Sequence, residues 1–209
     1  MRVWLEWTVS NGLAERNLAD YPNRLGRTVH SQLSLLPLQD LPHTITSIAL
    51  AQDHSLALTS GGYILSWGHN RFAQLGYVID PADRPTGSSK DDQEIQISPK
   101  RIVGLLKKEW VNGVAAGRMS SACWTEDSVW TWGTNAGHLG ASSLKKSLQN
   151  RSIVEGYEKA ANPVQVLPRK VTVISTPVID IALSDYAMIC LLDSHEVLCF
   201  HHDVNFRIR

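Results

Sequence analysis

Short apolar runs separated by turn residues recur through the middle of the chain. Residues 45–76 read ITSIALAQDHSLALTSGGYILSWGHNRFAQLG, in which apolar runs of five or six residues show no helical period. Such runs, bounded by Gly, Asp and Ser, predict β-strands. Gly61-Gly62 lies between two of the runs, and the favoured two-residue hairpin turns need the positive φ that glycine tolerates. The pattern predicts an all-β chain.

The same pattern repeats further along the sequence. Residues 111–140 read VNGVAAGRMSSACWTEDSVWTWGTNAGHLG, and they align with the first segment when one residue is dropped at the glycine turn and one before the final Leu-Gly. Residues 178–201 continue in the same frame. Self-similarity at this period is the signature of a repeat architecture. We expect equivalent first strands to carry Ala49, Ala115 and Ala182, and equivalent neighbouring strands to carry Trp67, Trp132 and Phe200.

The repeat predicts one domain over residues 1–209, an incomplete array with polar insertions. Its units cover about 20–44 (a remnant), 45–110, 111–177 and 178–209, and its insertions cover 80–98 and 141–162. Insertions in repeat arrays form loops on one face, which is often the binding face. The alternative interpretation is a tolerated surface loop.

The units resemble the regulator-of-chromosome-condensation repeat. The match rests on Val114-Ala115-Ala116-Gly117, on Trp130-x-Trp132-Gly133-x-Asn135 and on Gln74-Leu75-Gly76, and it covers roughly residues 20–203. The resemblance implies an all-β fold, a partial β-propeller with about three to four blades of the seven that members of this family close into a ring. It also implies a structural hydrogen bond for His54. The third unit departs from the repeat, because Phe200-His201 replaces Trp-Gly and no Leu-Gly follows.

Within this family the chain is most similar to the inhibitor of Bruton tyrosine kinase type. The similarity rests on residues 113–118, 123–125 and 137–140. In that type, ankyrin repeats precede the propeller and BTB domains follow it, and the whole protein is a substrate receptor for cullin-3 ubiquitin ligases. The resemblance therefore implies a protein-interaction scaffold, with protein partners and a cullin-3 complex reached through flanking domains. None of those flanking domains lies in this sequence.

Composition and charge limit the classes of partner that we expect the chain to bind. Lys plus Arg equals Asp plus Glu at 20 each, so the formal net charge is zero, whereas nucleic-acid binders show a clustered basic excess. We interpret the basic pairs 107–108, 145–146 and 169–170 as solvated loop ends. No apolar run approaches the ~20 residues of a spanning helix, and the three cysteines give no even disulfide framework. We expect a cytoplasmic or nuclear protein that binds neither nucleic acid nor membrane.

The motifs that would carry chemistry are weak. A metal cluster at His201-His202-Asp203 is less favoured than a polar strand end, because zinc needs three or four convergent ligands. His195-Glu196 lacks the second histidine of H-E-x-x-H, and Ser98-Pro99 offers only a common phosphorylation dipeptide in a predicted loop. Cys123 with His138 or His54 would be a nucleophile–base pair, but a mid-strand cysteine is an inert setting. We assign no catalytic, cofactor-binding or metal-binding residue, and we expect no cofactor.

Three functions from different classes follow from these observations. The first is a non-catalytic interaction scaffold, the propeller part of a BTB-type adaptor for a cullin-3 ligase. The second is nucleotide exchange on a small GTPase, which the founding member of the repeat family performs. The third, an enzyme with a site in the central channel, has no convergent set of polar residues to support it.

Overall fold

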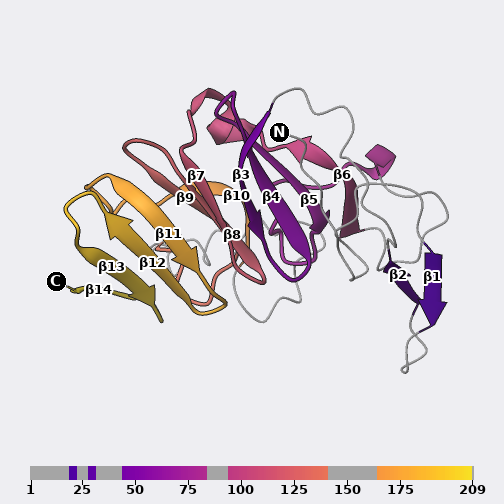
Figure 1. Ribbon diagram of the computed structural model, residues 1–209. Helices are drawn as coiled ribbons and strands as arrows, with labels where there is room; N and C mark the ends of the chain where they lie inside the picture. Colours follow the sequence, from indigo (N-terminus) through magenta and orange to yellow (C-terminus); the bar gives the residue numbers. More distant parts are fainter. Residues whose placement is uncertain (1–18, 23–27, 32–43, 84–93, 141–163, 209) are drawn as a thin grey trace.

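The computed structural model describes residues 19–22, 28–31, 44–83, 94–140 and 164–208. Three four-stranded antiparallel sheets stand side by side, and each is a meander whose strands pair in chain order (Figure 1). We call them the first, second and third blades. The first contains β3 (Ile45–Leu50), β4 (His54–Thr59), β5 (Ile64–His69) and β6 (Ile95–Arg101). The second contains β7 (Gly113–Ala116), β8 (Ser120–Trp124), β9 (Val129–Thr134) and β10 (Val164–Lys170). The third contains β11 (Val178–Leu183), β12 (Ala187–Leu192), β13 (Val197–His201) and β14 (Val204–Ile208).

Shorter elements lie outside the blades. Strands β1 (Ala19–Pro22) and β2 (Thr28–Ser31) form a separate two-stranded sheet within the unit that the sequence predicts as a remnant. The 3-10 helices η1 (Pro81–Asp83) and η3 (Gly104–Lys108) follow β5 and β6. No helix in the described part of the chain is long and apolar enough to cross a membrane.

The hydrophobic core lies between the blades. The first strands meet at the inner edge of the array, where β7 contacts both β3 and β11. One buried cluster joins the first blade to the second and includes Leu56, Leu58 and Trp132. Another joins the second blade to the third and includes Ala122, Trp124 and Phe200. Each blade is therefore stabilised by apolar area that it buries against its neighbour.

The predicted repeat equivalence is confirmed in the strand register. Ala49, Ala115 and Ala182 lie on the first strands of their blades, opposite Leu56, Ala122 and Ile189 respectively. Trp67, Trp132 and Phe200 all lie on third strands, opposite Ser55, Ser121 and Met188. A position in one blade can therefore be assigned to its counterpart in the other two.

The predicted polar insertion at residues 80–98 is wrong at its C-terminal end. Ile95–Ser98 belong to β6, which pairs with β5, and so Ser98-Pro99 lies in a strand and not in the predicted loop. A fourth strand has one neighbour only, so its sequence can alternate apolar and polar residues and still pair. Residues 84–93 and the second insertion at 141–162 lie outside the described residues.

A hydrogen-bond network fixes the second blade to the first. The carbonyl oxygen of Gln74, in the loop after β5, accepts the Ser121 hydroxyl and the Trp132 indole N–H, each at 2.8 Å. His54 Nε2 lies 2.8 Å from Ser121 Oγ. Since the hydroxyl proton of Ser121 points to Gln74, the imidazole donates from Nε2, and its buried Nδ1 has no hydrogen-bond partner. His54 is therefore the structural residue that the repeat implies.

Side-chain caps shape the loop that follows the third strand in the first two blades. Asn70 Oδ1 accepts the backbone N–H of Leu75 at 3.0 Å, and Asn135 Oδ1 accepts that of Leu139 at 3.2 Å. In the repeat, the asparagine side chain thus caps the loop by accepting the backbone N–H of the leucine in the Leu-Gly pair. The third blade replaces this loop with a tight turn at His202-Asp203, whose φ angles are 48° and 63°.

Gly133 is a position where a side chain would be costly. Its φ is +96°, and an added Cβ would lie 2.5 Å from the carbonyl oxygen of Met119. Gly104 also has positive φ, at +73°, but an added Cβ there would meet nothing within 4 Å. We expect Gly133→Ala to lower the free energy of unfolding by about 3 kcal/mol or more, and Gly104→Ala by about 1–2 kcal/mol, measured by urea denaturation. Equal losses would show that the contact with Met119 does not matter.

Burial of His54 predicts an acid-dependent stability. Burial lowers the pKa of His54 to about 3, against about 6.5 for the unfolded chain. Below pH 6.5 the unfolded state therefore takes up a proton that the folded state refuses, and stability that is complete above pH 6.5 falls as the pH is lowered towards 3. We expect a loss of about 2 kcal/mol from this group between pH 6.5 and 5.

The variant His54→Gln removes this titration and keeps a donor for Ser121. We expect its denaturation midpoint to depend less steeply on pH than that of the wild type. His195→Asn is the matched control, because His195 is exposed in a turn with φ of 65°, which asparagine tolerates. If His54→Gln kept the full acid slope, the assignment to His54 would be wrong.

Candidate interaction surface

The cysteine and histidines that could form a nucleophile–base pair are used in packing. Cys123 is fully buried between the first two blades, and burial raises the pKa of its thiol. Each histidine contacts a serine hydroxyl. His54 contacts that of Ser121, and His138 Nε2 lies 3.3 Å from that of Ser120. Burial lowers the pKa of His138 to about 4, so its imidazole is neutral. Cys123 and His54 therefore serve the contact between the first two blades, and His138 serves a contact within the second blade.

The polar motifs of the third blade are also engaged within the protein. Glu196 pairs with Arg207 at 2.9 Å, and His195 Nδ1 lies 3.0 Å from the carbonyl oxygen of Asp193. The backbone N–H of Asp203 donates to the carbonyl of Gly137 at 2.8 Å. Within the described ranges no three His, Cys, Asp or Glu side chains come together in a way that could hold a metal ion.

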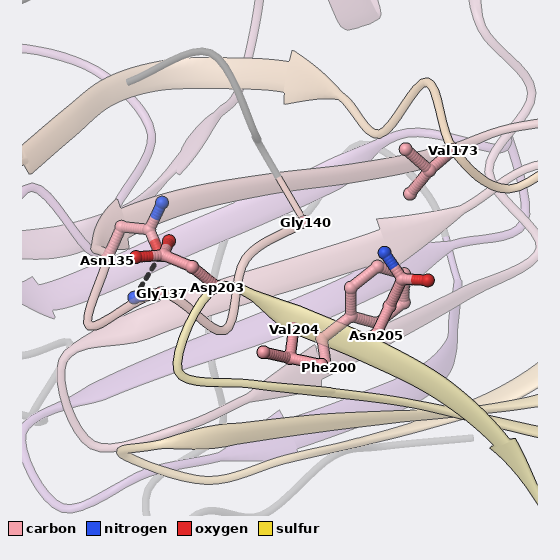
Figure 2. A pocket seen from close by; sticks show the side chains of 8 residues that line it. All are labelled: Asn135, Gly137, Gly140, Val173, Phe200, Asp203, Val204 and Asn205. Carbon is pink, nitrogen blue, oxygen red and sulfur yellow. Dashed lines mark hydrogen bonds between the residues drawn. The ribbon is translucent and has the colours of Figure 1, made fainter. Parts of the chain in front are cut away.

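A small pocket lies where the second and third blades meet (Figure 2). The loop of the second blade contributes Asn135, whose Oδ1 also accepts the N–H of Gly137 at 2.9 Å. The third blade contributes Phe200 and the start of β14, and Asp203 is the acidic group in the lining. The pocket is thus a narrow gap between two packed blades, in which the amide oxygen of Asn135 already accepts two backbone hydrogen bonds.

The outer rim between the first two blades exposes large apolar side chains. Trp110 is 64% exposed, although its ring also lies over Gly62, where an added Cβ would come within 2.6 Å of it. Leu105 is exposed on η3. The buried residue of η3, Leu106, shares a core cluster with Trp130, the register partner of Lys170. This packing places η3 beside the end of β10.

Cations surround these apolar side chains. Lys107 and Lys108 close η3, and Arg169 and Lys170 close β10, with which η3 is in contact. Two acidic groups lie nearby. The charge of Glu109 contributes to the raised pKa of the Cys123 thiol. The pKa of the Asp127 carboxyl is lowered by hydrogen bonds from Ser128 and Thr125 and then by the charge of Lys170. We define the rim surface as Arg101, Leu105, Lys107, Lys108, Trp110, Arg169 and Lys170.

The sequence interpretation of two basic pairs as separate loop ends misses this surface. The pairs 107–108 and 169–170 are 62 residues apart in the chain, and the fold brings η3 into contact with β10. The repeat does contain one indication of this surface. Arg101 pairs with Leu65 and Lys170 pairs with Trp130, and Leu65 and Trp130 are equivalent positions of their blades, so both fourth strands carry a cation at the same place. The third basic pair, 145–146, lies outside the described residues.

Sequence comparisons link the chain to a repeat family and to larger proteins. The family model for the Regulator of chromosome condensation (RCC1) repeat matches residues 45–74. The BTB/POZ domain-containing protein 1 of Schizosaccharomyces pombe is 33% identical over 177 residues, which cover 85% of this chain and 11% of that protein. The human inhibitor of Bruton tyrosine kinase is 36% identical over 98 residues, 47% of this chain and 6% of that protein. The chain thus spans a small part of these relatives.

Solved structures support the fold. The human protein WBSCR16 superposes with a TM-score of 0.62 at 19% identity, covering 86% of this chain and 42% of that chain. Prp20p of Saccharomyces cerevisiae superposes with a TM-score of 0.61 at 20% identity, covering 85% and 40%. The chain is therefore a partial β-propeller built from regulator-of-chromosome-condensation repeats, related in sequence to a BTB/POZ protein and to inhibitors of Bruton tyrosine kinase.

Proposed function

We propose that this chain is a non-catalytic interaction scaffold, the propeller part of a BTB-type substrate adaptor for a cullin-3 ubiquitin ligase. The observation that carries the proposal is the 33% identity to a BTB/POZ protein along 85% of the chain. A BTB domain elsewhere in a longer protein would hold the ligase, and the propeller would present the substrate. Four buried polar side chains fit this division: Ser121 and His54 join two blades, and Asn70 and Asn135 cap the loops that follow the third strands.

The rim surface is the face that we assign to the substrate. Exposed Trp and Leu side chains surrounded by cations are typical of binding hot spots, where an aromatic anchor is desolvated and charges select the partner. The complementary partner is a protein segment with one apolar anchor and several acidic residues. Such a partner would pair with Lys107, Lys108 and Arg169, while Lys170 already faces Asp127.

The adaptor role is tested in the full-length protein that carries this propeller. We expect it to co-purify with cullin-3, and we expect Trp110→Ala combined with Leu105→Ala to leave cullin-3 bound and to reduce bound, ubiquitylated client about tenfold or more. Tyr186→Ala, an exposed aromatic residue of the third blade, is the matched control and should keep the client. The readout is quantitative mass spectrometry of the purified complexes. Absence of cullin-3 would reject the adaptor role, and an unchanged client set would reject the rim surface.

Nucleotide exchange is the alternative function. Prp20p, whose structure was reported with its binding to Gsp1p and histones, shares 20% identity with this chain, and a likeness at that level shows the fold alone. We expect the chain to leave GDP release from a panel of small GTPases within about twofold of the spontaneous rate. Fluorescent GDP displacement measures this directly, and a clear acceleration of any GTPase would favour exchange over the scaffold role.

A further inference from the structure

The outermost strands of the first two blades share a bulge. In β6 the three residues 97–99 stand opposite the single residue Trp67 of β5. In β10 the three residues 166–168 stand opposite Trp132 of β9. Because Trp67 and Trp132 are equivalent positions, the bulge belongs to the repeat, and the two outer strands can be aligned through it.

The two bulges carry the same order of residue types. Residues 96–101 of β6 read QISPKR, and residues 165–170 of β10 read QVLPRK. Proline cannot donate to a sheet ladder, so within sheets it occurs in edge strands and at bulges, and both conditions hold here. The alignment makes Ser98 of the first blade equivalent to Leu167 of the second.

The residue before the proline is exposed in both blades. Ser98 is exposed, and Leu167 is 57% exposed. Within the described part of the chain the Ser98 hydroxyl has no hydrogen-bond partner, whereas the Ser98 carbonyl oxygen accepts from Nε2 of the buried Gln96 at 3.1 Å. Since a leucine occupies the same place in the second blade, the fold does not require a hydroxyl there.

The sequence that begins at Ser98 fits the substrate groove of one class of kinase. It reads Ser-Pro-Lys-Arg. Proline-directed kinases phosphorylate a serine or threonine that is followed by proline, and some of them also prefer a cation at the third position after the acceptor. The chain has one other such dipeptide, Thr176-Pro177, but Val178-Ile179 follows it and supplies no cation. Ser98 therefore combines the sequence and the exposure that such a kinase needs.

We propose that Ser98 is the phosphate acceptor of a proline-directed protein kinase, and that its phosphorylation weakens the binding of acidic partners at the rim surface. In the transfer, Ser98 Oγ forms a bond to the γ-phosphorus of ATP, and the bond from that phosphorus to the bridging oxygen of ADP breaks. ADP leaves with the electron pair of the broken bond, and the catalytic aspartate of the kinase takes the hydroxyl proton. The acceptor does not depend on the adaptor role, whereas the effect on binding rests on the function proposed above.

The cations after Ser98 link the phosphate to the rim surface. Arg101 is a member of that surface, and its guanidinium lies 4.1 Å from the centroid of the Tyr63 ring. Lys100 Nζ lies 5.6 Å from the centroid of the Tyr77 ring. At most about 10 Å of strand separates Ser98 from Arg101, close to the ~8 Å over which exposed charges act at physiological salt. A phosphoserine carries about −1.5 to −2 charges at pH 7, so it offsets the charge of both cations.

Intact-mass spectrometry of the full chain tests the acceptor. We would incubate the chain with ATP and a purified cyclin-dependent kinase, and we expect one added phosphate that peptide mapping assigns to Ser98. Ser98→Ala should take up none. Thr176 is the internal control, because the same kinase should leave it unmodified. A chain that gains no phosphate, or gains it at Thr176 alone, would overturn the proposal.

The second blade offers a gain-of-site test. Leu167→Ser places a hydroxyl in the equivalent bulge, before Pro168 and the cations Arg169-Lys170. The side chain is exposed, so we expect the variant to fold and to take up a second phosphate. Adding Pro168→Ala should remove the second phosphate and keep the first.

A synthetic peptide of residues 94–104 separates sequence recognition from access in the fold. We expect the kinase to phosphorylate both the peptide and the folded chain. Phosphorylation of the peptide alone would show that the strand shields Ser98, and the proposal would be wrong. We also expect the phosphorylated chain to melt at nearly the temperature of the unmodified chain, because the hydroxyl is already solvated. A phosphate that unfolds the first blade would show that the kinase reached Ser98 only in the unfolded chain.

The effect on binding is measured with a fluorescein-labelled peptide of several glutamates around one tryptophan. We expect phosphorylation to weaken its binding about threefold or more at physiological salt, as followed by fluorescence anisotropy. Kinase-treated Ser98→Ala is the matched control and should keep the original affinity. Unchanged affinity of a fully phosphorylated chain would reject the effect on binding. Failure of the unmodified chain to bind the peptide would instead reject the rim surface.

Discussion

The structure depends on the burial of one sheet face against the next. A four-stranded sheet with apolar side chains on both faces cannot bury either of them alone, so its stability comes from its neighbours. Among the residues that the structure describes, two of the three buried clusters lie between blades, and the residues that fill them alternate along each strand. The second blade uses Cys123 and Trp132 towards the first blade, and Ala122 and Trp124 towards the third.

Buried polar groups obey the same constraint. A hydroxyl or imidazole removed from water must find a partner, and in this fold the nearest partners belong to the adjacent blade or to the loop that caps the strand. The Ser121 hydroxyl hydrogen-bonds both to His54 and to the Gln74 carbonyl across the first contact. Residue types that could serve catalysis in an open cleft are thus drawn into packing in the described blades, and the surface that we propose for binding consists of exposed side chains on the rim.

The repeat could be predicted from the sequence because its signals are local. Trp67-Gly68 and Trp132-Gly133 mark equivalent strands by themselves, and the register of Ala49, Ala115 and Ala182 follows from their spacing. The start of strand β6 was not predicted, because Ile95–Ser98 alternates apolar and polar residues beside a polar stretch. The rim surface could not be predicted from the sequence, because it depends on a contact between η3 and β10 that no local sequence pattern indicates.

The two contacts between blades reach a fixed geometry by different means. The first uses three directional hydrogen bonds around Gln74 and Ser121, whereas Met188 and Phe200 at the equivalent positions of the third blade cannot donate. A backbone hydrogen bond provides the directional contact that these side chains cannot make. The backbone N–H of Asp203 donates to the Gly137 carbonyl at 2.8 Å. The two segments are so close that an added Cβ at Gly137 would lie 2.6 Å from the Asp203 nitrogen. The tight turn at 202–203 thus supplies a directional contact between the second and third blades, in addition to the apolar cluster that they share.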